Sequence, residues 1–517
     1  MSNNHILAPY IVTRSSAGRM ATALTALAAL VPVAALAQDG GAARTWAVDP
    51  SVSLRQTFTD NQRLQTIKES DSITEATAGI RLSSNGGRVR GFLDYSLTGS
   101  AYARNGNANE LRHSLSSTAT AELIDGQAFV DLRGSYTRQA ISAFGSQTTV
   151  PGLTETNQAD VASFSIAPHI RGRLGSVARY EARLSYDIAR AKGTDAGDTD
   201  SSSASLHFDD GASSAALGWS ADASHNVSDF RGGRRTFDSR MRAGLSYVVT
   251  SELKLGVSAG TERTDVRTLD AESNATYGLS AQWTPTERTL LSGNVEKRYF
   301  GTGYALNFSH RMPNTVWTLS DSRDVSNTSA QGNASFGSAY DLFFRQFASL
   351  EPDVTKRDVL VRNHLQTNGI DPNAVVVGGF LRSAATLQRA QSASMALVGV
   401  RNTVTARLSN SRSTRADSVV TALDDLSTAQ LVRQRGLTLD WAHRLTLQST
   451  VTLGGSYQRS DSDLASQQTT LKAITLLWTG TLGPKSGFTA GVRHAVFDSV
   501  TAPYDENALF AAFRFAF

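Results

Sequence analysis

Cysteine is absent from the 517-residue sequence, and its absence removes several classes of protein at once. Without a thiol there is no disulfide, no cysteine-ligated zinc or iron–sulfur cluster, and no covalently attached haem. The sequence also lacks an excess of charge of one sign, because charged residues make up 19% of the chain and the formal net charge is only +4. Nucleic-acid binding needs clustered Lys and Arg, and no such cluster with interleaved aromatic residues is present, so we expect no nucleic-acid partner.

Long hydrophobic runs are also missing. Beyond residue 37 no stretch of about 18 consecutive apolar residues occurs, which excludes membrane-spanning helices there. The one extended apolar run follows a polar segment that contains Arg14 and Arg19, and it ends in Ala-Leu-Ala. This order predicts a secretory signal peptide over residues 1–37. The mature chain, 38–517, then starts at Gln38, and because this residue is not cysteine a lipoprotein anchor is excluded.

What the sequence does have is alternation with a period of two. The segment VARYEARLSYDIA, from Val177, places Ala, Tyr, Leu and Ile on one face and Arg, Glu, Ser and Asp on the other. The segments RGFLDYSLTG, LKLGVSAGTE and GLTLDW repeat the pattern. The strands that these segments mark run about ten to fourteen residues, which suits tilted strands that cross a membrane. We count roughly 22 of them from about Val48 to Phe517.

The predicted fold class is therefore all-β: a transmembrane antiparallel up-and-down β-barrel of roughly 22 strands, with one helical insert in a long loop. Short turns, such as Gly172–Ser176, alternate with longer polar loops. Short periplasmic turns and long external loops are typical of outer-membrane barrels, and an even strand count puts both ends of the barrel on the periplasmic side. The predicted long loops include Ala140–Gln158, Lys192–Asp200, Ser411–Gln430 and Arg459–Gln467.

One region, Ser338–Gly369, breaks the period. Leu342, Phe343, Phe347 and Leu350 recur at helical spacing, after a pair of residues that resembles a capping box. A proline separates this helix from a second one, which ends before a glycine. An amphipathic helical hairpin must cover its apolar face, so we expect residues 338–369 to plug the lumen or to cap its mouth. The plain alternative is a long surface loop.

No motif in the sequence indicates catalysis. The segment GVSAG, Gly256–Gly260, matches the nucleophile elbow, but an elbow needs a strand–turn–helix context and this one lies inside an alternating strand. The histidines show no ligand spacing such as HExxH, and the acidic loop Asp195–Asp200 does not match an EF-hand. We therefore expect no catalytic residue, no metal site and no cofactor, and we do not expect an enzyme.

The polar faces of the alternating segments carry charges of both signs. An arginine that faces lipid near the bilayer midplane costs about 2–4 kcal/mol, so these charges are expected to line the lumen. They are either interstrand salt bridges of the kind found in any wide barrel or a hydrated, mixed-charge path for a polar solute. The candidate path consists of Arg90, Asp94, Asp131, Arg133, Arg179, Glu181, Arg183, Asp187, Arg240, Arg242, Lys254, Glu262, Glu296, Arg298, Arg407 and Asp440.

The final segment, LFAAFRFAF, alternates like a membrane strand. Leu509 and the phenylalanines Phe513, Phe515 and Phe517 are expected on its lipid face. We expect this strand to pair with the first one, near Val48–Phe58, because that pairing removes both sheet edges. The three phenylalanines also resemble the signal that the barrel-assembly machinery reads.

Three stretches resemble a known family. They are WAVDPSVSLRQTFTDNQRL from Trp46, NTVWTLSDSRDVSNTS from Asn314, and LQRAQSASMALVGVRNTVTARLSNSR from Leu387. They resemble outer-membrane β-barrels associated with the PEP-CTERM/exosortase system of Gram-negative bacteria, which accompany exopolysaccharide biosynthesis and export. The resemblance implies a location in the cell outer membrane and a non-enzymatic passage or scaffold in exopolysaccharide export or exosortase-linked envelope assembly.

The implied partners are outer-membrane lipid and lipopolysaccharide, the barrel-assembly machinery, polysaccharide and periplasmic export proteins. The main alternative is a general or substrate-specific porin for small polar solutes. Two further classes are an outer-membrane hydrolase, disfavoured by the missing catalytic site, and a scaffold that clamps a periplasmic partner.

Overall fold

A computed structural model describes residues 46–84, 86–148, 153, 156–210, 216–326, 379–417 and 424–517, together with ten separate residues between 340 and 365. The predicted signal peptide, 1–37, lies outside the described residues, as do the capping pair and the final glycine predicted for the insert. Among the described residues, no helix has the length and apolar character needed to span a membrane.

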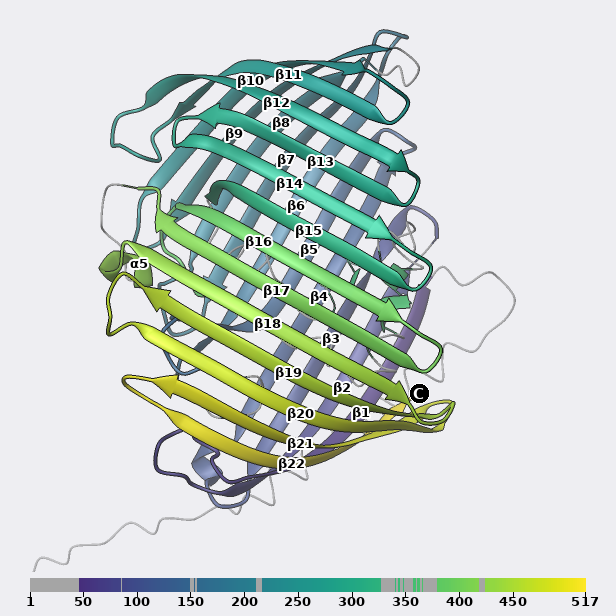
Figure 1. Cartoon of the computed structure of the whole chain (residues 1–517), viewed down its shortest axis with the longest axis vertical. Coiled ribbons are helices and arrows are strands. Elements are labelled where there is room, and N and C mark those ends of the chain that lie inside the picture. Colours follow the sequence, from purple (N-terminus) through teal and green to yellow (C-terminus); the bar gives the residue numbers. More distant parts are fainter. Residues whose placement is uncertain are drawn as a thin grey trace, which may run out of the picture.

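The described chain forms one closed antiparallel sheet of 22 strands (Figure 1). Each strand pairs with its neighbours in the sequence, and the last strand pairs with the first, Ala516 opposite Ser51 and Ala508 opposite Thr59. This confirms the predicted barrel and its closure. The strands are β1 (Trp46–Thr59), β2 (Asp71–Ser84), β3 (Val89–Tyr102), β4 (Glu110–Ile124), β5 (Ala128–Ala140), β6 (Gln158–Leu174), β7 (Ala178–Ala191), β8 (Thr199–Asp209), β9 (Leu217–Phe230), β10 (Arg235–Val248), β11 (Leu253–Thr264), β12 (Glu272–Thr286), β13 (Thr289–Arg298), β14 (Gly301–Arg311), β15 (Thr315–Ser326), β16 (Thr386–Val398), β17 (Asn402–Arg415), β18 (Leu431–Arg444), β19 (Ser449–Ser462), β20 (Gln468–Gly483), β21 (Ser486–Ser499) and β22 (Tyr504–Ala516).

Two short helices accompany the strands: the 3-10 turn η1 (Gly106–Ala108) and α5 (Asp425–Thr428). Described residues of the insert that are helical include Tyr340, Phe343 and Val361, in agreement with the helical pattern seen there in the sequence.

The two ends of the barrel differ. At the end that carries the start of β1 and the end of β22, the strands are joined by short turns, and Gly126 and Gly175 close two of these turns with left-handed backbone, at φ +66° and +59°. At the other end lie the longer connections, including residues 141–157 and 416–430. We call these ends the short-turn end and the long-loop end; in Figure 1 they lie at the right and left.

Three predicted loop boundaries were wrong by a few residues, in the same direction. β8 begins at Thr199, β17 runs on to Arg415, and β19 runs on to Ser462, so the strands extend into segments predicted as loops. These strand ends carry polar residues on both faces, which removes the alternation that marks the membrane part of each strand.

The outer face of the barrel carries an apolar belt. In β22, Leu509, Phe513 and Phe515 are exposed on the outside at 55%, 46% and 36%, whereas Phe510 between them points inward and is 7% exposed. All six tryptophans face outward at 38–52% exposure, and each lies toward the short-turn end of its strand. They are Trp46, Trp219, Trp283, Trp317, Trp441 and Trp478. An exposed apolar belt bounded by a ring of tryptophans is the surface of a barrel that sits in lipid, so the architecture is that of an outer-membrane β-barrel.

Candidate functional site

The lumen wall is polar and its charges are paired across strands. Asp131 of β5 accepts a hydrogen bond from Arg183 of β7 at 2.7 Å and from Thr120 of β4 at 2.7 Å, with His169 3.4 Å away. Arg183 also reaches Glu181 at 3.2 Å. Four neighbouring strands therefore share one charge network at the short-turn end of the wall.

A second network crosses the wall from β9 to β13. Arg242 lies 3.1 Å from Asp222 and 4.0 Å from Glu296, while Arg240 lies 3.3 Å from the same Glu296. Asp222 also contacts His207 at 2.7 Å. Sequence analysis did not single out Asp222, although it falls on the polar face of its strand.

The most deeply buried charges lie at the long-loop end. Arg298 pairs with Glu262, whose side chain is fully buried, and donates to Asp324 at 2.6 Å. Its guanidinium also lies 5.0 Å from the centre of the Phe300 ring. This group therefore links β11, β13 and β15 across the inner face of the wall.

The pairing register of the strands places the other predicted lumen charges on the same inner face of the barrel. Arg179 binds Asp209 at 2.7 Å, and Asp187 accepts from Ser185 at 3.1 Å. Arg407 lies opposite Thr438, and Asp440 lies opposite Thr405. The remaining residues of this face are Arg90, Arg133 and Lys254, placed by the pairings Arg90 with Thr120, Arg133 with Thr118 and Lys254 with Val248.

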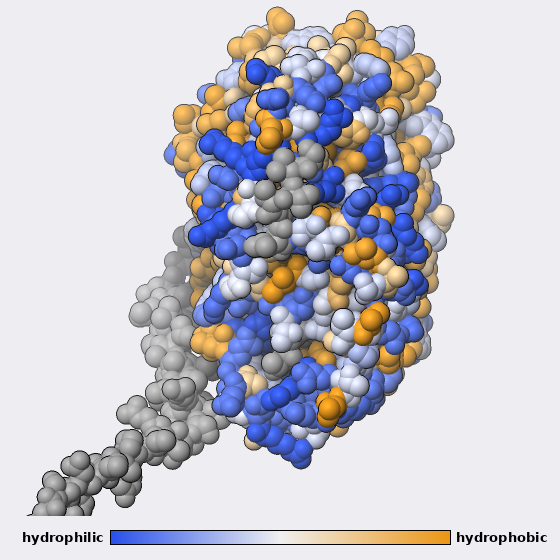
Figure 2. Space-filling model, turned by 90° about the vertical axis from the view of Figure 1, so that its left-hand side faces the viewer, coloured by the Kyte–Doolittle hydropathy of each residue, from blue (hydrophilic) through white to orange (hydrophobic). Residues whose placement is uncertain are grey.

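Loops fold across the long-loop end of the lumen. We call the described residues 141–148, 379–385 and 424–430 the mouth cover. Within it Asp425 accepts hydrogen bonds from the Ala143 N–H at 2.6 Å and from the Ser142 hydroxyl at 2.7 Å. Burial raises the pKa of Asp425, and these two hydrogen bonds oppose that rise. Figure 2 looks onto this end and shows a mainly hydrophilic surface.

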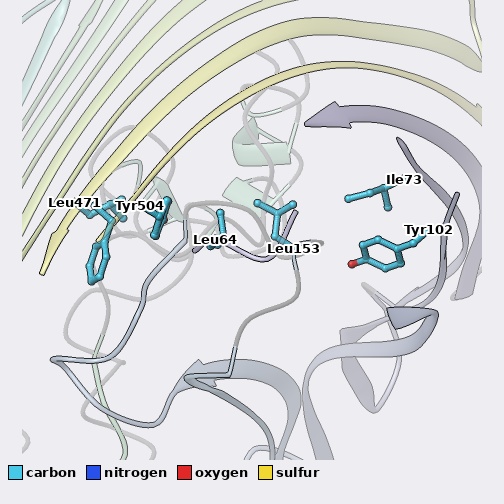
Figure 3. Packing of buried hydrophobic residues seen from close by; sticks show 7 residues of the cluster. Leu64, Ile73, Tyr102, Leu153, Leu471 and Tyr504 are labelled. Carbon is cyan, nitrogen blue, oxygen red and sulfur yellow. The ribbon is translucent and has the colours of Figure 1, made fainter. Parts of the chain in front are cut away.

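The loop after β5 reaches the wall beyond the β1–β22 junction, at β22 and β19. The Gln147 carbonyl accepts from the Tyr504 hydroxyl of β22, and the Gln147 side chain accepts from Gln458 of β19 at 2.5 Å. In Figure 3, Leu64 and Leu153 lie between Ile73 and Tyr102 on one side and Leu471 and Tyr504 on the other.

Two more apolar clusters fasten the cover. Phe380 and Leu426 pack with Ala143, and Leu381 packs with Val161 and Ala196. Phe380 also forms a parallel bridge with Ala140 at the end of β5. The cover is therefore held by apolar packing as well as by hydrogen bonds.

The insert reaches the lumen wall near the other end of the barrel. Its Asp358 pairs with Arg81 of β2, and its Arg362 lies 2.5 Å from Asp94 of β3. Arg81 and Asp94 face each other across the two strands at 2.8 Å, close to the turn that joins β2 to β3 at the short-turn end. The insert connects β15 to β16 at the long-loop end, whereas its described residues Asp358 and Arg362 bind the wall toward the opposite end of the barrel.

Aromatic rings complete this contact, which we call the insert latch. Tyr340 donates a hydrogen bond to Asp358 and lies edge-on to Phe92 of β3, with ring centres 6.3 Å apart. Arg362 lies over both rings, 5.4 Å from Phe92 and 4.8 Å from Tyr340. Behind them Phe343, Phe347, Val361 and Leu365 are buried together.

Of the insert latch, sequence analysis named only Asp94. Arg81 lies on the polar face of β2 and could have been found by extending the alternation by one strand. Asp358 and Arg362 are spaced four apart on a helical pattern, but nothing local shows that they meet the wall.

The GVSAG motif does not have the backbone conformation of a nucleophile elbow. Ser258 lies within β11, opposite Gly244 on one side and Gly278 on the other, so the turn that a nucleophile elbow requires is not there. In the acidic loop, Asp198 accepts from the Ala191 N–H and Asp200 pairs with Arg190. Among the residues that the structure describes, no three His, Asp or Glu side chains are grouped to hold a metal ion.

Comparison with known proteins gives no family. No family model and no curated protein matches the chain. Among solved structures, the siderophore receptor PirA from Pseudomonas aeruginosa is 8% identical over 93% of this chain and 81% of its own, with a TM-score of 0.43. The FrpB iron transporter from Neisseria meningitidis is 11% identical over 92% and 82%, with a TM-score of 0.47. PirA from Acinetobacter baumannii is 9% identical over 91% and 80%, with a TM-score of 0.46. At these identities and scores the similarity assigns no function to this chain.

Proposed function

We propose that this protein is an outer-membrane passage for a polar solute, and that its own insert closes the passage at rest. The observation that carries the proposal is the insert latch, in which Asp358 and Arg362 bind Arg81 and Asp94 on the lumen wall. A segment that enters at the long-loop end and is fixed near the short-turn end occupies the path that a solute would take. The prediction that residues 338–369 plug the lumen becomes part of this proposal.

The polarity of the wall supports a hydrated solute. Arg179, Glu181, Arg183 and their neighbours place both signs of charge along the lumen, so the wall favours neither cations nor anions strongly. Charges and hydroxyls that already pair with one another can exchange those partners for water or for sugar hydroxyls as a solute passes. A solute with many hydroxyl groups matches this chemistry better than an apolar one.

The mouth cover and the insert latch weigh against a permanently open general porin. Opening requires the latch to separate and the cover to move, and both are held by buried contacts. An external trigger, either the solute itself or a periplasmic partner, would therefore control passage.

Exopolysaccharide is the substrate class that we propose, on the strength of the sequence resemblance to exosortase-associated barrels. A polysaccharide is a hydrated, hydroxyl-rich chain, which fits the wall described above. The protein acts as a passage or scaffold and not as an enzyme. The alternative substrate class is a small polar nutrient taken up through the same lumen.

Deletion of the gene separates the two substrate classes. We expect the deletion strain to lose surface polysaccharide, measured by sugar analysis of washed cells, while small-nutrient uptake stays at the parental rate. A strain carrying the wild-type gene on a plasmid serves as the control and should regain polysaccharide. Normal polysaccharide together with reduced uptake would refute export and favour the nutrient passage.

A further inference from the structure

A row of arginines lies on the outer surface of the barrel, away from the lumen. In the strand register, Arg389 of β16 lies opposite Arg412 of β17, and Arg412 lies opposite Arg433 of β18. Arg435 of β18 lies opposite Arg459 of β19. We call these five residues the arginine rim.

The arginine rim faces outward, as the alternation of burial shows. In β17 the neighbours of Arg412, Ser411 and Ser413, are 3% and 4% exposed and point inward, while Arg412 is exposed. In β18 the neighbours of Arg435 are likewise buried, and Arg435 is exposed. The rim therefore lies on the same face as the lipid-facing apolar belt.

The rim carries more positive charge than its surroundings neutralise. Two aspartates form ion pairs with arginines of the rim: Asp321 lies 2.9 Å from Arg389, and Asp461 lies 3.1 Å from Arg433 and 3.8 Å from Arg459. Among the residues that the structure describes, the side chains of Arg412 and Arg435 make no ion pair or hydrogen bond. Like charges directly opposite each other on neighbouring strands destabilise a sheet, so a bound anion would stabilise this arrangement.

Two other pairs of outward-facing charges near the long-loop end are balanced within the chain. On β7 and β8, Arg190 pairs with Asp200 at 2.8 Å, and on β20 and β21, Lys472 lies 3.5 Å from Asp498. In the rim, outward-facing arginines lie opposite one another on successive strands, and Arg323 of β15, opposite Arg389, extends the row by one strand.

The height of the rim places it at the lipid boundary. Directly toward the short-turn end lie the outward-facing Leu408, Leu437, Leu439 and Trp441, all 41–56% exposed. Arg435 and Trp441 are six residues apart on one strand, about 20 Å along the strand. The rim therefore lies where the apolar belt gives way to the polar surface, on the side of the membrane that the long loops face.

We propose that the arginine rim binds the phosphate groups of a lipid in the outer leaflet, the phosphorylated glycolipid lipopolysaccharide. Guanidinium groups bind phosphate with two parallel hydrogen bonds, and several side by side match a headgroup that carries more than one phosphate. The acyl chains of that lipid would lie along Leu408, Leu437 and Leu439. An outer-leaflet lipid, and not a soluble anion, is the occupant because the rim borders directly on the lipid-facing belt.

The experiment compares wild-type barrel with the double variant Arg412→Gln/Arg435→Gln in detergent. These two arginines have no partner of their own among the described residues, so their loss breaks no ion pair there. The matched control is Arg190→Gln/Lys472→Gln, which removes the same charge from other strands. Fluorescent lipopolysaccharide carrying its lipid A phosphates, the same lipopolysaccharide after phosphatase treatment, and inorganic phosphate as a competitor are the three probes. Heat-modifiable gel migration checks that each barrel is folded.

We expect the double variant to bind phosphorylated lipopolysaccharide about tenfold or more weakly than wild type, with the control close to wild type. Wild type should lose the same affinity for phosphatase-treated lipopolysaccharide. Equal binding by wild type and the double variant, or an equal loss in the control, would overturn the proposal. Full displacement by inorganic phosphate would also overturn it, because it would identify a site for a soluble anion. If the double variant does not fold, Arg435→Lys keeps the charge but loses the paired hydrogen bonds, and unchanged binding by that variant would overturn the proposal.

Discussion

Replacing Asp358 with asparagine tests how firmly the insert is held in the lumen. Asp358 is 7% exposed and accepts hydrogen bonds from Arg81, Tyr340 and Arg362, the last at 2.9 Å. Asparagine keeps the shape and one oxygen acceptor but removes the negative charge between two guanidinium groups. The variant therefore weakens the insert latch without leaving a cavity.

The size of the effect follows from the contacts that remain. A hydrogen bond to a charged group contributes about 1.5–3 kcal/mol, and Asp94 still binds both Arg81 and Arg362 after the change. Because that second carboxylate compensates in part, we expect a loss of about 2 kcal/mol in latch stability. An equilibrium shifts tenfold for each 1.4 kcal/mol, so the released insert should become about 30 times more populated.

Single-channel recording in a planar bilayer measures this population as the fraction of time spent in the larger conductance state. The matched control is Asp222→Asn, which removes a lumen carboxylate that binds Arg242 and His207 and not the insert. The latch account predicts frequent large openings for Asp358→Asn and few for Asp222→Asn or wild type. Equal opening by the two variants would refute it.

Three further predictions concern the wall, the belt and the mouth cover. Arg298→Ala leaves the buried Glu262 without its arginine partner, so we expect the free energy of unfolding to fall by about 3–5 kcal/mol. Gel-shift unfolding should show a lower urea midpoint for this variant, and an unchanged midpoint would contradict the prediction. Leu439→Arg puts a charge on the lipid face at a cost of about 2–4 kcal/mol, so less folded barrel should reach the outer membrane; the lumen-facing control Thr438→Arg should assemble better. Burial raises the pKa of Asp425 when the mouth cover is docked, so docking should be strongest in acid and should weaken as the pH rises from the ordinary aspartate pKa through the raised pKa. Hydrogen exchange of residues 141–148 measures this pH dependence, and Asp425→Asn should remove it.

The barrel itself was predictable because its signal is local. The strand Ala178–Ala191 alternates over 14 residues, and this length together with a period of two is typical of a strand that has lipid on one side and water on the other. Strand number and the closure of β22 on β1 followed from counting these segments, and both are confirmed.

The contacts that occupy the lumen were not predictable in the same way. Gln147 meets Tyr504, and Arg81 meets Asp358, across separations of hundreds of residues that leave no periodic trace in the sequence. The arginine rim was missed for a related reason. From Ser411 to Arg415 both faces of the strand are polar, so these residues were predicted to begin a loop, although they continue β17 beyond the apolar belt.

The central claim is that the insert closes the lumen, and removing residues 340–367 tests it most directly. The truncated barrel and the wild type are inserted into planar bilayers under the same salt, after heat-modifiable migration has shown that both are folded. A passage closed by its own insert predicts a clear rise in single-channel conductance for the truncated barrel. Conductance equal to that of the wild type would contradict the claim.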